Sequence, residues 1–432
     1  MRVFRIREKL GSSLWFVPLL CVLGGVVLSF VTIALDRWSG GSAVPRSLSG
    51  DPDAALSILT TVAASMVTLT GLVLTVTMVV VQLAMGQFSP RVLRTILRDR
   101  PSQFAIGVFV ATFAHAMLVM REVKAASGQD EGYVPGLAIV VAFVLIIISI
   151  MVLVSYVNHI GQSLRVASLI QSVGDETRER LDELYPSDRD DGRAPVATPE
   201  GEPDRTIDAP EAGVLYRIDH AELVQKARQA GVVLKLLRRI GDFVPEGASL
   251  FAVYGKGRFD EDDLVSSVAI GKERTMHQDL AFGFRMLVDV AERSLSSAMG
   301  DPTTAIQAID RLHDNLRQLA CRPFPPEQHF DEGGELRLIT PTIPWETYVQ
   351  LAFDEIRHYG KHSLQVASRL KAMLEDLVDV APLERRPPLE RQLRLVEAMA
   401  KRAFEDEEDV EAALRPDHQG IGSAAPREPQ QV

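Results

Sequence analysis

The sequence predicts an α-helical multi-pass membrane protein with four transmembrane helices and a cytoplasmic α+β region, in which a small β-rich module precedes a helical domain. The first observation is a set of four long uncharged segments, at about 14–35, 56–86, 104–120 and 137–157. A helix needs roughly 20 apolar residues to cross the hydrocarbon core of a bilayer, so each segment suits one crossing. The second observation is the charged remainder of the 432-residue chain, which must form soluble structure.

The flanks of these segments predict their orientation. Basic residues gather on two flanks: Arg2, Arg5, Arg7 and Lys9 before the first span, and Arg91, Arg94, Arg98 and Arg100 between the second and third. The first segment is too long for a signal peptide and ends without an Ala-x-Ala site, so we interpret it as an uncleaved span. Because Lys- and Arg-rich flanks stay inside, we expect a plasma-membrane protein whose N-terminus and C-terminal domain are cytoplasmic.

The second segment is uncharged from Ala54 to Gln87. As a helix it would be roughly 50 Å long, against a core of about 30 Å, so it must tilt, break or project beyond the bilayer. Thr61, Thr68, Thr75 and Gln82 recur at intervals of seven and share one face. Two interpretations remain open: a polar line along a path for water, ions or a substrate, or helix packing with hydroxyls bonded to their own backbone.

The connection after the second span has the pattern of a short surface helix. Ser89 suits the cap and Pro90 the first helical position. The apolar residues that follow share one side, and Arg91, Arg94 and Arg98 point elsewhere. We therefore expect these arginines to contact anionic lipid headgroups, with a solvated connector as the alternative.

The third segment contains His115, the only histidine in the four apolar segments. Gly107 and Ala111 precede it at one-turn spacing and predict close helix packing. We expect His115 to bond to a neighbouring helix, such as to a threonine or Gln82, and keep it as a candidate pathway residue. No acidic residue lies in these segments, which disfavours a proton pump.

After the spans, composition predicts five parts. We expect a juxtamembrane helix at 161–185, a flexible linker at 186–210, a β-rich module at 211–257, a helical domain at 271–415 and a disordered tail at 416–432. In the module, three strands are predicted near 214–218, 232–237 and 250–254, with a helix capped by Asp219. In the helical domain, one helix ends at Gly300, and Asp301 and Pro302 begin the next, before further helices near 345–359, 363–380 and 389–414.

Several classes of function find no support in the sequence. The net charge of −11 and the absence of a dense basic face argue against a nucleic-acid partner. The two cysteines, Cys21 and Cys321, lie in different parts of the chain and are not expected to pair. No zinc-ligand motif and no phosphate-binding loop accompanies His277, His313, His358 or His362, so we predict no cofactor, no metal and no enzymatic activity.

Several local motifs together resemble those of an uncharacterised family of predicted bacterial integral membrane proteins, a domain-of-unknown-function family. They are 67–73 with 82–84 and 87–91, 271–275 with 278–279, and 287–291 with 301–305. The resemblance spans most of residues 10–380 and implies a membrane location, but no activity. Within these motifs, Arg274, Asp279, Asp289, Asp301, Pro302 and Thr303 are candidate structural residues of the cytoplasmic part.

The first functional hypothesis is an oligomeric channel or transport protein in the lipid bilayer, with a path lined by the second span and a cytoplasmic regulatory domain. Four helices are barely enough to enclose a pore, so this hypothesis requires a homo-oligomer. The alternative is a membrane-anchored sensor or scaffold that binds a cytoplasmic ligand or protein. An intramembrane enzyme ranks last, because the spans lack paired acids and a nucleophile with its base.

Overall fold

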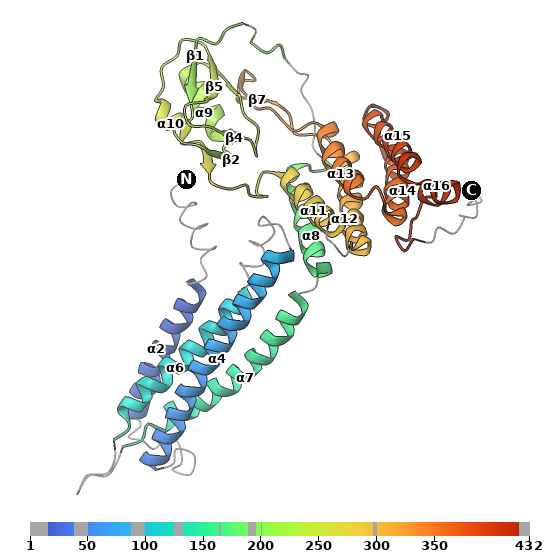
Figure 1. Ribbon diagram of the computed structural model, residues 1–432. Coiled ribbons are helices and arrows are strands. Elements are labelled where there is room, and N and C mark those ends of the chain that lie inside the picture. The colour runs from blue at the N-terminus through green and yellow to red at the C-terminus, as the bar shows by residue number, and fades with distance from the viewer. Residues whose placement is uncertain are drawn as a thin grey trace. The chain divides into compact units, whose positions relative to one another are not determined.

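The computed structural model describes residues 16–38, 51–87, 100–124, 133–163, 166–188, 196–199, 201–296 and 300–422. The chain divides into two compact units, one ending at Arg165 and the other beginning at Val166. Helices dominate both units, and strands occur in the second (Figure 1). This confirms the predicted fold class.

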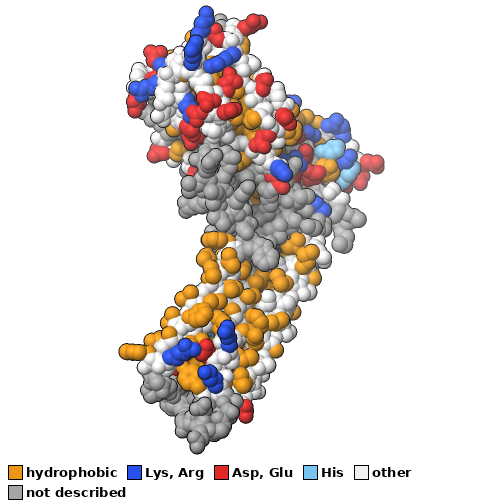
Figure 2. Space-filling model, turned by 90° about the vertical axis from the view of Figure 1, so that its left-hand side faces the viewer, with side chains coloured by type: hydrophobic (Ala, Val, Ile, Leu, Met, Phe, Trp, Pro, Cys, Tyr) orange, Lys and Arg blue, Asp and Glu red, His pale blue; other side chains and the backbone are white. Residues whose placement is uncertain are grey.

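Four helices form the first unit: α2 (Phe16–Trp38), α4 (Pro52–Gln87), α6 (Arg100–Glu122) and α7 (Gly136–Ser163). All four are long and apolar enough to cross a membrane. They lie side by side (Figure 1), and hydrophobic side chains cover the face of these helices seen in Figure 2. The 36 residues of α4 form one unbroken helix of about 54 Å. Of the three predicted ways to fit the bilayer core, a break in the helix is therefore excluded, which leaves tilting or projection beyond the core.

Helix α6 is the centre of this unit and packs against α2, α4 and α7. In its most apolar stretch, 56% of the α6 residues are buried, against 17–22% in the other three helices. Small residues permit the closest approach, as the pair Gly107 and Ala111 predicted. A Cβ on Gly107 would lie 2.7 Å from Cys21 Sγ, and one on Gly25 would lie 2.8 Å from Ala111 O. Helices α2 and α6 therefore touch backbone to backbone.

The second unit begins with α8 (Val166–Leu184), and its strands form two small sheets. The five-stranded sheet has the order β1-β5-β3-β8-β7, in which only the β3–β8 pair is parallel. The three-stranded sheet has the order β4-β2-β6 and is antiparallel. The bounds are β1 (Arg205–Asp208), β2 (Gly213–Ile218), α9 (His220–Ala230), β3 (Val233–Leu236), β4 (Phe243–Val244), β5 (Ser249–Tyr254), α10 (Glu261–Val265), β6 (Val268–Gly271), β7 (Gln328–Phe330) and β8 (Leu336–Ile339).

These sheets correct two predicted boundaries. The range 186–210 is not linker throughout, because β1 lies within it and pairs with β5. The range 271–415 is not entirely helical, because β7 and β8 lie within it and complete the five-stranded sheet. Neither strand carries a long apolar run: β7 reads Gln-His-Phe and β8 reads Leu-Arg-Leu-Ile. Strand β8 pairs with β3, and β7 pairs with β8 at the edge of the sheet. A local sequence pattern does not reveal such pairing.

The remaining helices are α11 (Leu280–Ser296), α12 (Pro302–Ala320), α13 (Trp345–Tyr359), α14 (Leu364–Val380), the short 3-10 helix η1 (Leu383–Arg385), α15 (Arg386–Ala403) and α16 (Glu407–Leu414). The helix predicted over 389–414 is therefore two helices, separated at Phe404. Of the tail predicted to be disordered, residues 423–432 lie outside the described residues and 416–422 have a defined structure. There the buried Asp417 carboxylate accepts hydrogen bonds from the backbone N–H groups of Gln419, Gly420 and Gly422.

Candidate functional site

The predicted polar stripe lies on the outer side of α4. Thr61, Thr68, Thr75 and Gln82 are all exposed on the unit and face away from α6. Each threonine hydroxyl donates to the carbonyl oxygen four residues earlier, at 2.8 Å from Thr61, 3.0 Å from Thr68 and 2.8 Å from Thr75. These hydroxyls are therefore satisfied within α4 and do not seal contacts between the unit's own helices.

The stripe belongs to a longer pattern, which we call the outer seam. Its eight members are exposed and alternate at spacings of four and three: Ser57, Thr61, Ala64, Thr68, Gly71, Thr75, Met78 and Gln82. The same spacing, begun two residues earlier, marks the inner seam toward α6: Ala55, Leu59, Val62, Met66, Leu69, Val73, Val76 and Val80. Spacings of four and three are those of helices in left-handed coiled coils. Helix α4 thus has two opposite faces with this spacing, and among the described residues only the inner one is covered by a neighbouring helix.

His115 does not join this stripe. It is fully buried between α2, α6 and α7. Its Nδ1 lies 2.9 Å from Ser29 Oγ of α2, and its Nε2 lies 3.0 Å from the carbonyl oxygen of Ala138 in α7. His115 therefore bonds to neighbouring helices, as predicted, but its partners are neither a threonine nor Gln82 of α4.

Asp36 is a polar residue of the interior that the sequence analysis missed. It follows the first uncharged segment directly, and α2 continues far enough to carry it into the bundle, where it is 1% exposed. Its two carboxylate oxygens accept from the N–H groups of Leu137 and Ala138, at 3.0 Å each. It thus caps α7, which begins at Gly136 after Pro135 with no side-chain cap of its own. The sequence signal for this contact was the start of α7 at Pro135 and Gly136, which have no side chain able to cap the helix.

Other hydroxyls continue the polar interior. Thr112 of α6 lies 3.2 Å from Ser149 of α7, and both are fully buried. Ser29 also lies 2.8 Å from the carbonyl oxygen of Gly25. Because these residues are small and well separated in sequence, their spacing gave no periodic signal. The sequence disfavoured a proton pump because no acidic residue lies in the four segments. The buried carboxylate of Asp36, just after the first segment, removes part of that reason.

The lipid-surface hypothesis for Arg91, Arg94 and Arg98 falls on residues outside those that the structure describes. It remains a prediction from the sequence.

The candidate structural residues of the second unit are distributed over three places. Arg274 binds Asp279 through Nε at 2.8 Å and Nη2 at 2.7 Å, and Asp279 also accepts from the N–H of Phe282 in α11. Burial raises the pKa of Asp279, while the Arg274 guanidinium acts in the opposite direction. The turn at Gly241, with φ +88°, packs against this pair, since a Cβ there would lie 2.5 Å from Asp279 Oδ2. The pair therefore joins the sheets to the helices.

The other two places are helix features. Asp289 lies within α11 and accepts from Arg285 Nε at 2.5 Å. Asp301 caps α12 by accepting from the N–H of Thr304 at 3.1 Å, with Pro302 and Thr303 in the first turn. The hydrogen bonds from Thr304 lower the pKa of Asp301. Asp289 and Asp301 each make a local contact within or at the start of a helix, and the six candidate residues do not converge on one site.

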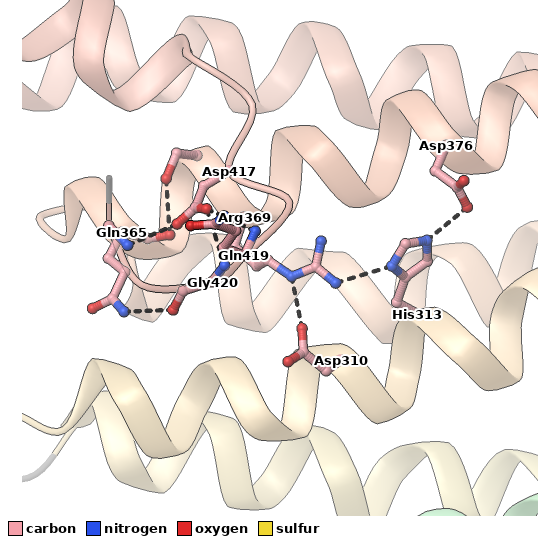
Figure 3. A network of polar contacts seen from close by, with 10 residues as sticks. Asp310, His313, Gln365, Arg369, Asp376, Asp417, Gln419 and Gly420 are labelled. Atoms are coloured by element: carbon pink, nitrogen blue, oxygen red, sulfur yellow. Dashed lines mark hydrogen bonds and ion pairs between the residues drawn. The ribbon is translucent and has the colours of Figure 1, made fainter. Parts of the chain in front are cut away.

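A polar network joins α12 to α14 (Figure 3). Arg369 donates to Asp310 at 2.7 Å and to His313 Nδ1 at 3.1 Å. Because arginine only donates, Nδ1 must accept, and Nε2–H then donates to Asp376 at 2.8 Å. The imidazole is thus held as one neutral tautomer with both nitrogens engaged, which leaves no lone pair for base catalysis or a metal. Asp314, its neighbour in sequence, pairs with Arg178 instead.

This tautomer predicts a pH dependence. Burial lowers the pKa of His313; Asp376 opposes this and Arg369 adds to it. The folded protein therefore binds fewer protons here than the unfolded chain. The contribution of His313 to the free energy of unfolding should be complete above about pH 6.5 and should decline as the pH falls toward the folded-state pKa. In detergent, the unfolding temperature of wild type should exceed that of His313→Gln, and this difference should narrow below about pH 6.5. A difference of constant size would contradict the assignment.

Of the remaining histidines, His220 and His329 form a close pair. Among the described residues, no group of three or more His, Cys, Asp or Glu side chains is arranged to hold a metal ion. His220 and His329 stack with ring centroids 4.6 Å apart, and His329 Nε2 lies 2.8 Å from Thr340 Oγ1. Burial lowers the pKa of His220, so its ring favours the neutral form.

Comparison with known proteins gives a family. A family model described as "Predicted membrane protein (DUF2254)" matches residues 11–376. An uncharacterized protein of Mycobacterium bovis and two of Mycobacterium tuberculosis strains are each 31% identical to the chain over 423 residues. The alignments cover 94% of this chain and 79% of each relative. No solved structure gives a significant match.

Proposed function

Because the chain belongs to the DUF2254 family of predicted membrane proteins, we propose that it acts within the bilayer, as an oligomeric channel or transport protein whose subunits meet at α4. The observation that carries this proposal is the outer seam, an exposed face of α4 built for helix packing. The second unit would then serve as a regulatory domain on the cytoplasmic side.

Apolar side chains of α2, α4, α6 and α7 form a continuous core between these helices. Whereas Thr77 faces inward and bonds to Tyr156, the outer-seam residues Thr61, Thr68, Thr75 and Gln82 point away from that core. A path lined by them therefore requires several copies arranged in a ring around it.

The composition of the outer seam suits contact with a second copy. Small residues such as Ala64 and Gly71 let helices approach closely in a membrane, and nothing lies within 4 Å of a Cβ built on Gly71. Gln82 places an exposed amide on the same face, and an amide in hydrocarbon favours a hydrogen-bond partner. Polar hydroxyls between these positions would face the path or the neighbouring copy.

Replacing Thr68 and Thr75 with valine tests conduction. Valine keeps the volume of threonine and removes the hydroxyl, so we expect a several-fold change in potassium or chloride flux through proteoliposomes without loss of folded protein. Thr70→Val is the matched control, because Thr70 also bonds its own backbone, at 2.7 Å to Met66, but lies half-buried on the inner side. Flux that is absent, or equal in all variants, would favour the membrane-anchored scaffold instead.

Cysteine cross-linking separates assembly from conduction. Oxidation of Gly71→Cys in membranes should give covalent dimers of the full chain, since Gly71 lies on the outer seam. Ala63→Cys faces the filled interior and should give none. Equal cross-linking of both variants would contradict the proposed contact.

We also propose that the N-terminus and the second unit lie in the cytoplasm of a bacterial cell with this protein in its inner membrane; the basic flanks support this. Cys321 is exposed and reports the side directly. In intact spheroplasts, a membrane-impermeant maleimide should leave Cys321 unlabelled and should label Asp53→Cys, which is exposed in the first turn of α4. Permeabilisation should make Cys321 accessible to the maleimide, and Cys321→Ser gives the background labelling. Labelling of Cys321 before permeabilisation would reverse the orientation.

A further inference from the structure

The hydrogen bonds around His115 are one proton short. The carbonyl oxygen of Ala138 can only accept, so His115 Nε2 must carry a hydrogen. Ser29 has one hydroxyl hydrogen and two neighbours able to accept it, the carbonyl oxygen of Gly25 at 2.8 Å and His115 Nδ1 at 2.9 Å. With a neutral imidazole, one of these two contacts lacks a hydrogen.

A proton added to Nδ1 satisfies every contact. Nδ1–H then donates to Ser29 Oγ, the Ser29 hydroxyl donates to Gly25, and Nε2–H continues to donate to Ala138. The geometry of the site is therefore complete for the doubly protonated ring. Only one N–H bond forms, and the proton comes from water.

The backbone of Ala138 connects this ring to a buried carboxylate. The carbonyl oxygen of Ala138 accepts from His115, and the N–H of Ala138 donates to Asp36. Asp36 is buried, as His115 is, so a charge on either group is weakly screened by solvent. An imidazolium and this carboxylate together carry no net charge inside the bundle.

The other groups near the ring are neutral or paired with one another. Ser29 comes from α2, Thr112 from α6 and Ser149 from α7. At the same end of the bundle as Asp36, Arg37 binds Glu122 at 2.5 Å. Helix α4 packs on α6 with apolar side chains and is uncharged from Ala54 onward. Asp36 is therefore the charged group best placed to balance a proton on His115.

We propose that His115 is a reversible proton-binding site inside the membrane unit, with Ser29 as the hydrogen-bond partner that switches and Asp36 as the counter-charge. Glu122 ends α6 seven residues after His115, a distance of about 10 Å along the helix. The ring therefore lies nearer to the end of α6 where Asp36 and the Arg37–Glu122 pair lie than to the other end of this helix. This site is separate from the outer seam and does not depend on assembly.

Nitrogen-15 NMR of histidine-labelled, full-length protein in lipid bilayers tests the proposal, with pH varied from about 5 to about 8. The His115 signal is assigned by its loss in His115→Gln. We expect it to change from a singly to a doubly protonated ring within this range. A signal that stays singly protonated while the protein remains folded would overturn the proposal and leave His115 a structural bond.

Two variants identify the partners. Ser29→Ala removes the acceptor of a charge-assisted hydrogen bond, so the ratio of doubly to singly protonated ring at a given pH should fall roughly five- to tenfold. Ser149→Ala is the matched control, since Ser149 is an equally buried serine that bonds Thr112 and not His115, and the ratio should hold. Asp36→Asn should lower the ratio as well, which keeps the test open if Ser29→Ala does not fold. Equal ratios in wild type, Ser29→Ala and Asp36→Asn would contradict the assigned roles.

Discussion

Replacing Asp279 with alanine is expected to lower the free energy of unfolding of the second unit by about 3 kcal/mol. The substitution leaves the guanidinium of Arg274 without its carboxylate and the N–H of Phe282 without its acceptor. It also opens a gap beneath the turn at Gly241, which packs on the Arg274–Asp279 pair. Because the carboxylate is 2% exposed, water does not readily replace it.

Denaturant unfolding of the solubilised protein, followed by circular dichroism, measures this effect. Asp279→Asn keeps an acceptor for Phe282 and loses only the charge, so it should fall between alanine and wild type. Glu332→Ala is the control, because it breaks an ion pair with Arg228 whose two side chains are 88% and 53% exposed, and it should leave the unfolding midpoint unchanged. Equal effects of Asp279→Ala and Glu332→Ala would contradict a joining role for Asp279.

Gly25→Val should have the largest effect in the membrane unit. A Cβ on Gly25 would lie 2.8 Å from the carbonyl oxygen of Ala111 and 3.0 Å from its Cβ, so α2 and α6 must separate. Overpacking of this kind costs about 1–3 kcal/mol, and more where backbone cannot yield. We expect a clear drop in the thermal unfolding temperature of the protein in detergent.

The neighbouring glycine provides a matched control. Nothing lies within 4 Å of a Cβ built on Gly24, so Gly24→Val changes the same helix by the same atoms without a collision. Its unfolding temperature should stay close to that of wild type. If both variants unfold alike, helix propensity or lipid contact dominates and the close approach of α2 to α6 does not limit stability.

Local patterns of the sequence were sufficient for the elements that carry their own signals. The uncharged segments predict α2, α4, α6 and α7, and the cap residues Asp219 and Asp301 predict where α9 and α12 begin. Strands β7 and β8 were not predicted, because β8 joins the sheet by pairing with β3, about a hundred residues earlier, and β7 joins it through β8. The structure of 416–422 was not predicted for a similar reason, since the Asp417 carboxylate and bonds to Gln365 and Ser368 of α14 hold this segment.

The candidate sites show the same limit. Seven-residue spacing placed Thr61, Thr68 and Thr75 on one face of α4, but only the structure shows that this face points outward. The Gly107 and Ala111 pattern predicted close packing of α6, and the structure supplies Cys21 and Gly25 as the other side. The partners of His115 lie 86 and 23 residues away in sequence and have no periodic relation to it, so no spacing could identify them.

Because α4 has two opposite seams, insertions or deletions within this helix affect both of its faces at once. One residue inserted beside Gly71 would turn everything beyond it by about 100° and would misalign both faces together. Seven inserted residues, close to two full turns, would nearly restore both alignments while lengthening the rod. The lengths that evolution can explore for α4 should therefore change in whole heptads.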